Sequence, residues 1–279
     1  MSAISREGDP SPKSKSYFDG GAALYDRSRP RYPDALIARI ADAVPGGDIL
    51  DVGCGSGIEA RQFQAAGCTV LGVDPDEQMA EYARTTGVPV EAGKFETWEA
   101  AGRTFDAVVA GTAWHWVDPR AGAAAAAQVL RPGGLLAPFH HSSLTPPELA
   151  DAAGSAIPAW TTRSADAYQR VGPQTPFDVD GRRKSPMGLY QPLFDEMAEG
   201  IRETGCFSEP EQWRFDWERT YTRDEWLGLL PTQGALAKLP QDELAEILDA
   251  AGVAIDKMGG SFSLPYATVA VTAVRLDVR

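Results

Sequence analysis

The sequence predicts an α/β fold in which a doubly wound, mostly parallel β-sheet is covered by helices on both faces. Short apolar segments typical of buried strands alternate with segments that have the apolar spacing of helices. The first strand–helix junction, within residues 49–66, also contains a glycine turn of the kind that binds nucleotide-like ligands in such sheets. At 279 residues the chain is long enough for one large core with a sizeable insertion.

The glycine turn follows the first expected strand, which ends with residues 49–52. Gly53, Gly55 and Gly57 lack the Cβ atom that would block a sharp turn and a close approach of the backbone to a ligand. Residues 58–66 then have the apolar spacing of a helix that packs back on the sheet. Strand, turn and helix together predict a binding site at this end of the sheet.

The residue order in the turn argues against one class of ligand. A dinucleotide fingerprint, G-x-G-x-x-G, requires glycine where the chain has Ile58, and it usually has an apolar residue where Asp51 stands. The pattern is instead acidic-x-G-x-G-x-G. An NAD-linked oxidoreductase is therefore a less favoured alternative.

Downstream of the first helix the alternation continues. Residues 69–73 form a β-branched strand that ends at Asp74, and a helix with an acidic first turn is expected over residues 75–85. Two strands, a helix, a Pro-Gly-Gly turn and a fifth strand follow, in this order, at residues 88–92, 105–110, 120–130, 131–134 and 135–140. This order predicts parallel strands with helical connections.

The alternation breaks down after the fifth strand. Residues 142–206 are rich in Pro and Gly and carry aromatic residues without strict periodicity, which predicts a partly helical cap insertion over the C-terminal end of that strand. Strands are expected again at 212–221 and 262–276, with helices at 223–230 and 241–251 between them. The complete prediction is a Rossmann-like sheet of seven strands.

Composition excludes several classes of function. A formal net charge of −13 argues against a nucleic-acid partner, since binding to phosphates requires clustered Lys and Arg. Cys54, Cys68 and Cys206 have no metal-ligand spacing and are interpreted as reduced thiols, and no metal site is expected. No apolar stretch approaches the roughly 18–20 residues of a membrane span, and a signal-peptide core is missing. We therefore expect a cytoplasmic protein without a membrane partner.

Several segments resemble the class I methyltransferases that depend on S-adenosylmethionine (SAM), in particular their small-molecule branch, often labelled methyltransferase type 11. The resemblance is carried by residues 51–57, by Asp74, by Phe105-Asp106-Ala107-Val108-Val109 leading into Ala113-Trp114-His115-Trp116, and by Leu130-Arg131-Pro132-Gly133-Gly134. Residues 25–33 also resemble the family's N-terminal helix entry. The resemblance implies SAM as the methyl donor and S-adenosylhomocysteine (SAH) as the product.

Composition, the broken alternation and the resemblance together suggest four parts of the chain: a polar, disordered tail (1–16), a SAM-binding core (17–141), a cap outside the resemblance that is expected to hold substrate specificity (142–206) and the C-terminal part of the core (207–279). The cofactor would contact residues at the strand ends. Asp74 is expected to accept the ribose hydroxyls or to cap the next helix, and Asp51 is expected to order the glycine loop or to be a buried structural carboxylate. The full set of expected cofactor residues is Arg29, Asp51, Gly53, Gly55, Asp74, Pro75, Phe95 and Ala113.

Roles for three of these residues come from the family alone. Arg29 matches an arginine that pairs with the methionine carboxylate, with Arg27 and Arg31 as alternatives in register. Phe95 is either beside the adenine or an ordinary core residue. Backbone at Ala113 is expected near the methionine part of SAM.

The acceptor side is expected to hold histidines and aromatic residues. His115, His140 and His141 lie at strand ends, and an imidazole there is either a general base or a structural group. Alternation along the strand sends His140 and His141 to opposite sides of the sheet. The candidate substrate-binding residues, each of which also fits ordinary packing, are Tyr17, Tyr25, Trp114, Trp160, Tyr168 and Tyr190.

The predicted function is methyl transfer from SAM to an O, N or C nucleophile of a small molecule, in secondary metabolism. A methyltransferase-like enzyme that uses bound SAM for a cyclisation or rearrangement is the alternative, because the two share the SAM loop. A non-enzymatic adaptor is the least favoured reading, since the glycine loop and Asp74 are intact.

Overall fold

The computed structural model describes residues 21–44, 46–143, 146, 148–149, 186–233 and 236–277. Seven strands form one sheet in the order β3-β2-β1-β4-β5-β7-β6, which confirms the predicted fold class. The strands are β1 (Asp48–Val52), β2 (Thr69–Asp74), β3 (Val90–Ala92), β4 (Phe105–Gly111), β5 (Leu130–Ser143), β6 (Glu211–Thr222) and β7 (Ser261–Val274). Strands β1 to β5 pair in parallel, whereas β7 is antiparallel to both β5 and β6.

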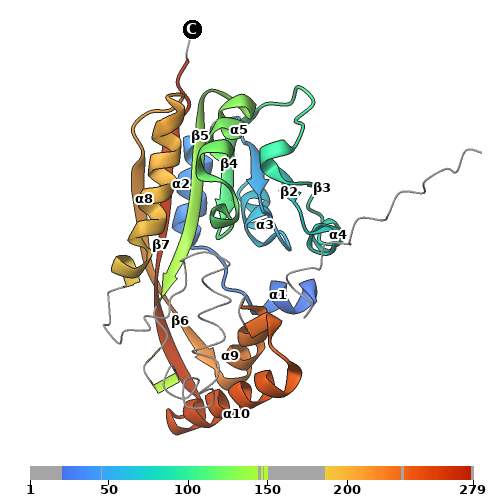
Figure 1. The fold of residues 1–279 in the computed structure, drawn as a ribbon, viewed down its shortest axis with the longest axis vertical. Coiled ribbons are helices and arrows are strands. Elements are labelled where there is room, and N and C mark those ends of the chain that lie inside the picture. Colours follow the sequence, from blue (N-terminus) through green and yellow to red (C-terminus); the bar gives the residue numbers. More distant parts are fainter. Residues whose placement is uncertain are drawn as a thin grey trace, which may run out of the picture.

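Helices cover both faces of this sheet (Figure 1). The helices are α1 (Ala22–Ser28), α2 (Asp34–Ala43), α3 (Ile58–Ala65), α4 (Glu77–Thr85), α5 (Pro119–Val129), α8 (Pro186–Thr204), α9 (Arg223–Leu229) and α10 (Gln241–Lys257). Four short 3₁₀ turns are η1 (Phe95–Thr97), η2 (Trp114–Trp116), η3 (Leu230–Thr232) and η4 (Leu236–Lys238). Among these helices none is long and apolar enough to cross a membrane.

Side chains of the central strands alternate between two buried cores, as a period of two requires. Leu50 of β1 packs in the core shared with α5 and α8, whereas Ile49 packs in the core shared with α2, α3 and α4. Phe194 of α8 is completely buried in the first of these cores. The last part of the segment predicted as a cap, residues 186–206, therefore contributes a helix to the layer that covers the sheet.

Local sequence signals explain where several helices begin. The side chain of Asp76 accepts hydrogen bonds from the backbone N–H groups of Gln78 and Met79, so Asp76 and not Asp74 caps α4. Helix α9 begins with a capping box between Thr222 and Glu225. The alternative role of Asp74 as a helix cap is thereby excluded.

Strand β5 is longer than the sequence predicts. It begins at Leu130, and the register with β4 shifts so that Phe105 pairs with Leu130 while Ala107 pairs with Leu135. The predicted turn at 131–134 lies inside this strand. Gly133 adopts a φ of +79°, and its N–H donates a hydrogen bond to the carbonyl of Arg275. A backbone partner from the far end of the chain thus extends the strand past the Pro-Gly-Gly sequence.

A third core lies outside the parallel part of the sheet. Strands β6 and β7 project past β4, and α9 and α10 pack on their projecting ends (Figure 1). The core between them contains Tyr221, Trp226, Ile247, Phe262 and Tyr266. We call α9, α10 and the projecting ends of β6 and β7 the helical extension. It lies at the carboxyl end of the parallel strands, toward which the arrow of β5 points in Figure 1.

Candidate cofactor and acceptor site

The strand order reverses between β1 and β4, and ligands of open α/β sheets bind at the carboxyl end of such a switch point. The glycine turn lies there, immediately after β1. Gly53, Gly55 and Gly57 have φ values of +67°, +53° and +83°, which L-residues with side chains rarely adopt. A Cβ atom on Gly53 would come within 2.6 Å of the Cβ of Ala113, so the turn is pressed against the segment that follows β4.

The carboxylate of Asp74 holds this turn in place. Its Oδ2 accepts a hydrogen bond of 2.7 Å from the N–H of Gly55, and its Oδ1 accepts one of 2.8 Å from the N–H of Asp76. Burial raises the pKa of Asp74 to about 6, and the two backbone hydrogen bonds oppose that rise. The end of β2 therefore presents a buried carboxyl group whose oxygens still have free lone pairs.

Two further carboxyl groups lie close to Asp74. Asp51 of β1 is fully buried, and neither of its oxygens has a hydrogen-bond partner in the described part of the chain. Glu59, in the first turn of α3, is 4% exposed and accepts a backbone hydrogen bond from Gly111. Burial raises the pKa of Asp51 well above its ordinary value and that of Glu59 to about 8. We call Asp51, Glu59 and Asp74 the carboxyl cluster.

Among the described residues, no Lys or Arg side chain forms an ion pair with the carboxyl cluster. Arg61 lies near enough to lower the pKa of Glu59, but its guanidinium is ion-paired with Asp26. An orphaned buried carboxyl such as Asp51 is costly unless a ligand supplies a donor. The site therefore fits a ligand that brings a positively charged or N–H-rich group to the carboxyl end of β1. No set of three or more His, Cys, Asp or Glu in the described ranges is arranged to hold a metal ion.

Sequence reasoning missed Glu59, Tyr32 and Thr112, which lie around the end of β4. The hydroxyl of Tyr32 donates a 3.0 Å hydrogen bond to Oγ1 of Thr112, and Thr112 itself has a φ of +53°. A Cβ atom on Gly111 would lie 2.5 Å from Oε1 of Glu59 and 2.7 Å from the Tyr32 hydroxyl. The available signal was an acidic residue on the apolar face of the helix after the glycine turn. Backbone strain at Thr112 is of the kind found at functional sites.

Arg29, just past α1, provides the opposite charge. Its Nη2 donates a 2.6 Å hydrogen bond to the carbonyl of Thr232 in η3, and its guanidinium lies 4.7 Å from the ring centre of Tyr25. Its Nε is buried without a hydrogen-bond partner, and no carboxylate in the described part of the chain forms an ion pair with it. The remaining donors of Arg29 fit an anionic group such as a carboxylate.

Most of the other expected cofactor and substrate residues that the structure describes are buried, whereas Pro75 is exposed. Phe95 is 4% exposed and Trp114 is 1% exposed, and their ring centres are 6.3 Å apart in the core that contains α5. Ala113 is buried against Gly53, and Pro75 is exposed after β2. The side chains of Phe95 and Trp114 are therefore part of the hydrophobic core. Tyr17, Trp160 and Tyr168, together with most of the cap, lie outside the described residues.

The three histidines gather at the carboxyl ends of β4 and β5. His115 of η2 and His140 of β5 have ring centres 5.5 Å apart, and the ring of Tyr190 from α8 lies 5.2 Å from His140. His141 instead stacks on Tyr32 at 4.4 Å and contacts Tyr266 of β7. The two adjacent histidines thus contact different sets of residues, as the alternation along a strand predicts.

All three imidazoles are uncharged at neutral pH. Burial, together with a smaller effect of the positive charge of Arg29, lowers the pKa of His115 to about 4 and that of His141 to about 3. The pKa of His140 also lies well below its ordinary value. Burial is the main cause, and the neighbouring His115 and His141 contribute to the decrease. The region next to the switch point is therefore lined by neutral polar and aromatic side chains.

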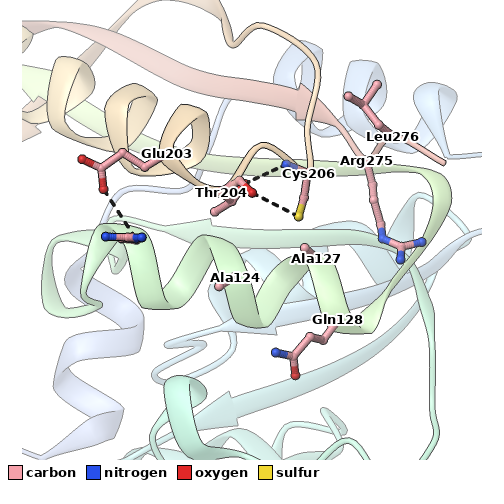
Figure 2. A pocket seen from close by; sticks show the side chains of 9 residues that line it. Ala124, Ala127, Gln128, Glu203, Thr204, Cys206, Arg275 and Leu276 are labelled. Carbon is pink, nitrogen blue, oxygen red and sulfur yellow. Dashed lines mark hydrogen bonds and ion pairs between the residues drawn. The ribbon is translucent and has the colours of Figure 1, made fainter. Parts of the chain in front are cut away.

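A surface pocket of about 450 Å³ lies elsewhere on the molecule (Figure 2). It lies between α5 and α8, and the ion pair between Arg120 and Glu203 is at one end of its lining. Arg275, which also lines it, pairs with the start of β5. This is the amino end of the parallel strands, so the pocket is separate from the glycine turn and the histidines.

The carboxyl cluster predicts an unusual pH dependence of the ligand-free protein. Because the pKa values of Glu59 and Asp74 are raised on folding, the stability linked to them is fully present at low pH. It is lost as the pH rises through about 6 for Asp74 and about 8 for Glu59. Denaturant unfolding should therefore give a lower free energy of unfolding at pH 8.5 than at pH 5.5, by an amount on the order of a few kcal/mol.

Replacing Glu59 with glutamine removes one titrating group and keeps a hydrogen-bond acceptor. Glu59→Gln should flatten the pH dependence, most strongly between about pH 5.5 and 7.5, above the pKa of an unfolded glutamate and below the raised value of about 8. Glu77→Gln is the matched control, because Glu77 is exposed on α4 and lies outside the cluster. A Glu59→Gln protein with the same pH slope as the unchanged protein would show that Glu59 is ionised throughout this range.

Comparisons with known proteins identify a methyltransferase domain in the part of the chain that contains the glycine turn. Residues 50–137, which include the glycine turn and the end of β4, match the model of a methyltransferase domain. An uncharacterised methyltransferase of Mycobacterium tuberculosis is 29% identical over 262 residues, which cover 92% of this chain and 94% of that protein. A ubiquinone biosynthesis O-methyltransferase of Rhizobium rhizogenes is 27% identical over 176 residues, which cover 60% of this chain and 66% of that protein.

Solved structures share the fold. A proposed type II methyltransferase from Anaeromyxobacter dehalogenans has a TM-score of 0.59 and 24% identity, and the alignment covers 89% of this chain and 98% of that one. Phosphoethanolamine N-methyltransferase 2 of Haemonchus contortus, in complex with SAM, has a TM-score of 0.54 and 16% identity, with 95% of this chain and 59% of that chain covered. The chain thus contains a methyltransferase domain over residues 50–137, is similar along most of its length to an uncharacterised methyltransferase, and shares the fold of solved methyltransferases.

Proposed function

We propose that this methyltransferase takes its methyl group from SAM and transfers it to a small-molecule acceptor bound beside the three histidines. The observation that carries the proposal is the orphaned, fully buried carboxyl of Asp51 beside a glycine turn with three left-handed glycines. SAM supplies an ammonium group, a carboxylate and a methyl group on a positively charged sulfur. The ammonium group fits the carboxyl cluster, and the carboxylate fits the free donors of Arg29.

Each part of the site has a binding role in this proposal. Asp74 offers its remaining lone pairs to the ribose hydroxyls while its backbone partners keep it oriented. Gly53 and Gly55 allow the backbone to approach the cofactor closely. Pro75, Phe95 and Ala113 would border the cofactor through backbone atoms, since the side chains of Phe95 and Ala113 are buried.

Two features support a small acceptor. Tyr190 of α8 lies beside His140, and Tyr32, Trp217 and Tyr266 surround His141 on the other face of the sheet, so the rings described around these two histidines are aromatic. The hydrogen bond from Arg29 to Thr232 also joins the end of α1 to η3, which directly follows α9 of the helical extension. Such aromatic surroundings suit a compact apolar or aromatic molecule, whereas the net charge of −13 disfavours nucleic acid. A role in secondary metabolism stays a prediction.

A thermal-shift titration with SAM, SAH, NAD and NADP tests the cofactor. SAM or SAH at 100 times its Kd should add about 2.7 kcal/mol to the free energy of unfolding and raise Tm by several degrees. Asp74→Ala should abolish this shift because it removes the expected ribose contact. Stabilisation by a nicotinamide cofactor alone would overturn the proposal.

The second candidate, a cyclisation or rearrangement with bound SAM, needs a different readout. SAM labelled with tritium in the methyl group should transfer its label to the product if the protein is a methyltransferase. A converted substrate without tritium would favour the rearrangement.

A further inference from the structure

One of the three histidines, His140, is held in a defined tautomer by the backbone carbonyl of the next residue. Nδ1 of His140 lies 2.7 Å from the carbonyl oxygen of His141. A carbonyl oxygen only accepts hydrogen bonds, so Nδ1 carries the ring proton. In the neutral imidazole the other nitrogen, Nε2, then holds a free lone pair. The backbone of β5 thus fixes His140 as a hydrogen-bond acceptor.

The surroundings leave that acceptor nitrogen available. No hydrogen bond to Nε2 of His140 is formed within the described residues, and its ring neighbours are His115 from η2 and Tyr190 from α8. Burial raises the pKa of Tyr190 to about 12, so the phenol stays neutral. His115 is neutral as well. Nε2 is therefore a proton acceptor beside the carboxyl ends of β4 and β5, with uncharged groups around it.

His141 differs from His140, because its Nδ1 contacts a side-chain hydroxyl and not a backbone carbonyl. Nδ1 of His141 lies 2.8 Å from Oγ1 of Thr268, and the same oxygen accepts a 2.8 Å hydrogen bond from the indole N–H of Trp217. Its Nε2 is buried without a partner, and its ring is stacked on Tyr32. His141 is thus part of an aromatic wall across the sheet from His140. Nδ1 of His115 is also buried without a partner, so hydrogen bonding does not determine its tautomer.

Because His140 is a weak base, it is better suited to methylation of a hydroxyl oxygen than to methylation of an amine nitrogen. A hydroxyl oxygen that receives a methyl group becomes positively charged and strongly acidic, so even a weak base takes its proton. An amine that receives a methyl group becomes an alkylammonium, which holds its proton at neutral pH. Because burial lowers the pKa of His140, this imidazole suits the first case and not the second.

We propose that Nε2 of His140 is the proton acceptor for methylation of a hydroxyl group, so that the acceptor substrate is an alcohol, phenol or enol. In the balanced step the C–O bond forms as the C–S bond breaks, the electron pair of that bond stays on sulfur, and the hydroxyl proton moves to Nε2. The carbonyl of His141 stabilises the resulting imidazolium through Nδ1–H, and the proton is later lost to water. The inference rests on the proposed function.

Nitrogen-15 NMR of the protein with labelled histidine tests the tautomer in the complex with SAH. The chain has only three histidines, so His115→Gln and His141→Gln assign the ring signals. We expect Nδ1 of His140 to be protonated and Nε2 to be unprotonated between pH 5.5 and 8. Phenol should shift Nε2 toward the protonated range, whereas anisole, which has no O–H, should not. A proton on Nε2, or equal responses to phenol and anisole, would overturn the inference.

A methyl-transfer assay provides the second test of the proposal. With tritium-labelled SAM, phenol should be methylated on oxygen, and His140→Asn should lower kcat for phenol by about 10²- to 10⁴-fold with a smaller effect on KM. Asparagine retains an N–H group for the carbonyl of His141, so the loss would report the missing Nε2. Methylation of aniline in preference to phenol, or an unchanged kcat in His140→Asn, would contradict the proposal.

The two arms separate the possible failures. The NMR measurement requires no turnover, so it decides the tautomer even when neither model acceptor reacts. If SAH neither binds nor stabilises the protein, the proposed function fails. If SAH binds and Nε2 of His140 is protonated, only the inference about His140 fails.

Discussion

Replacing Asp51 with asparagine is expected to stabilise the ligand-free protein while weakening its affinity for SAM. Asp51 is a fully buried carboxyl without a hydrogen-bond partner in the described part of the chain. Burial and the neighbouring Glu59 and Asp74 raise its pKa, so ionising it opposes folding. Asparagine is nearly isosteric and carries no charge. At pH 8 we expect the free energy of unfolding to increase by about 1–3 kcal/mol.

The same substitution should have the opposite effect on the cofactor. Loss of a charged partner for an ammonium group costs about 1.5–3 kcal/mol, which corresponds to roughly 10- to 100-fold weaker binding of SAM. Urea unfolding and isothermal titration calorimetry measure the two effects separately. SAH should weaken to a similar extent, since it has the same amino group.

Asp48→Asn is the matched control on the same strand. Asp48 is at the opposite end of β1, where its partly exposed carboxylate pairs with Arg131 at 2.9 Å. A surface ion pair contributes about 0–1 kcal/mol, so the change in stability should be small and the affinity for SAM should not change. Equal affinities of the Asp51→Asn and Asp48→Asn proteins for SAM would remove Asp51 from the cofactor site.

The second large effect is expected at Gly53. In the Gly53→Ala protein the new Cβ would lie 2.6 Å from the Cβ of Ala113, and the backbone would keep a φ of +67°. The left-handed conformation costs about 1–2 kcal/mol, and overpacking costs typically 1–3 kcal/mol more. We therefore expect a loss of about 3 kcal/mol in the free energy of unfolding, measured by urea denaturation, together with loss of SAM binding.

Gly55→Ala separates the two causes. Gly55 has a similar φ of +53°, but a Cβ built there meets no other atom within 4 Å. Its cost in the ligand-free protein should be only the conformational part, about 1–2 kcal/mol. Equal losses in the two variants would show that Ala113 moves away and that the loop is not pressed against the end of β4.

The sequence was sufficient to predict the sheet because its strands are marked by local patterns. The apolar residues Ile49, Leu50 and Val52, the β-branched start of β2 and the apolar run that leads into Gly111 each identify a buried strand without tertiary information. The three glycines identify the switch point, because their positive φ values are a backbone property that residue type reports directly. The fold class and the cofactor loop could thus be predicted because both depend on local sequence patterns.

Features that arise from tertiary contacts were not predictable in this way. Residues 131–134 read as a turn, yet pairing with Arg275 keeps them in β5. Nothing local to Glu59 shows that its carboxyl accepts a bond from Gly111, which is distant in the chain. The helical extension was predicted as separate helices, and its common core with Tyr221 and Phe262 appears only when β6 and β7 pair.

The crowding around Gly111 restricts how related sequences can diverge. A side chain of any size at this position would collide with the carboxyl of Glu59 and the hydroxyl of Tyr32. A larger residue at position 111 would therefore require both of these side chains to shift or to be smaller. The choice of residue at position 111 is thus linked to positions 32 and 59, which lie far from it in the chain.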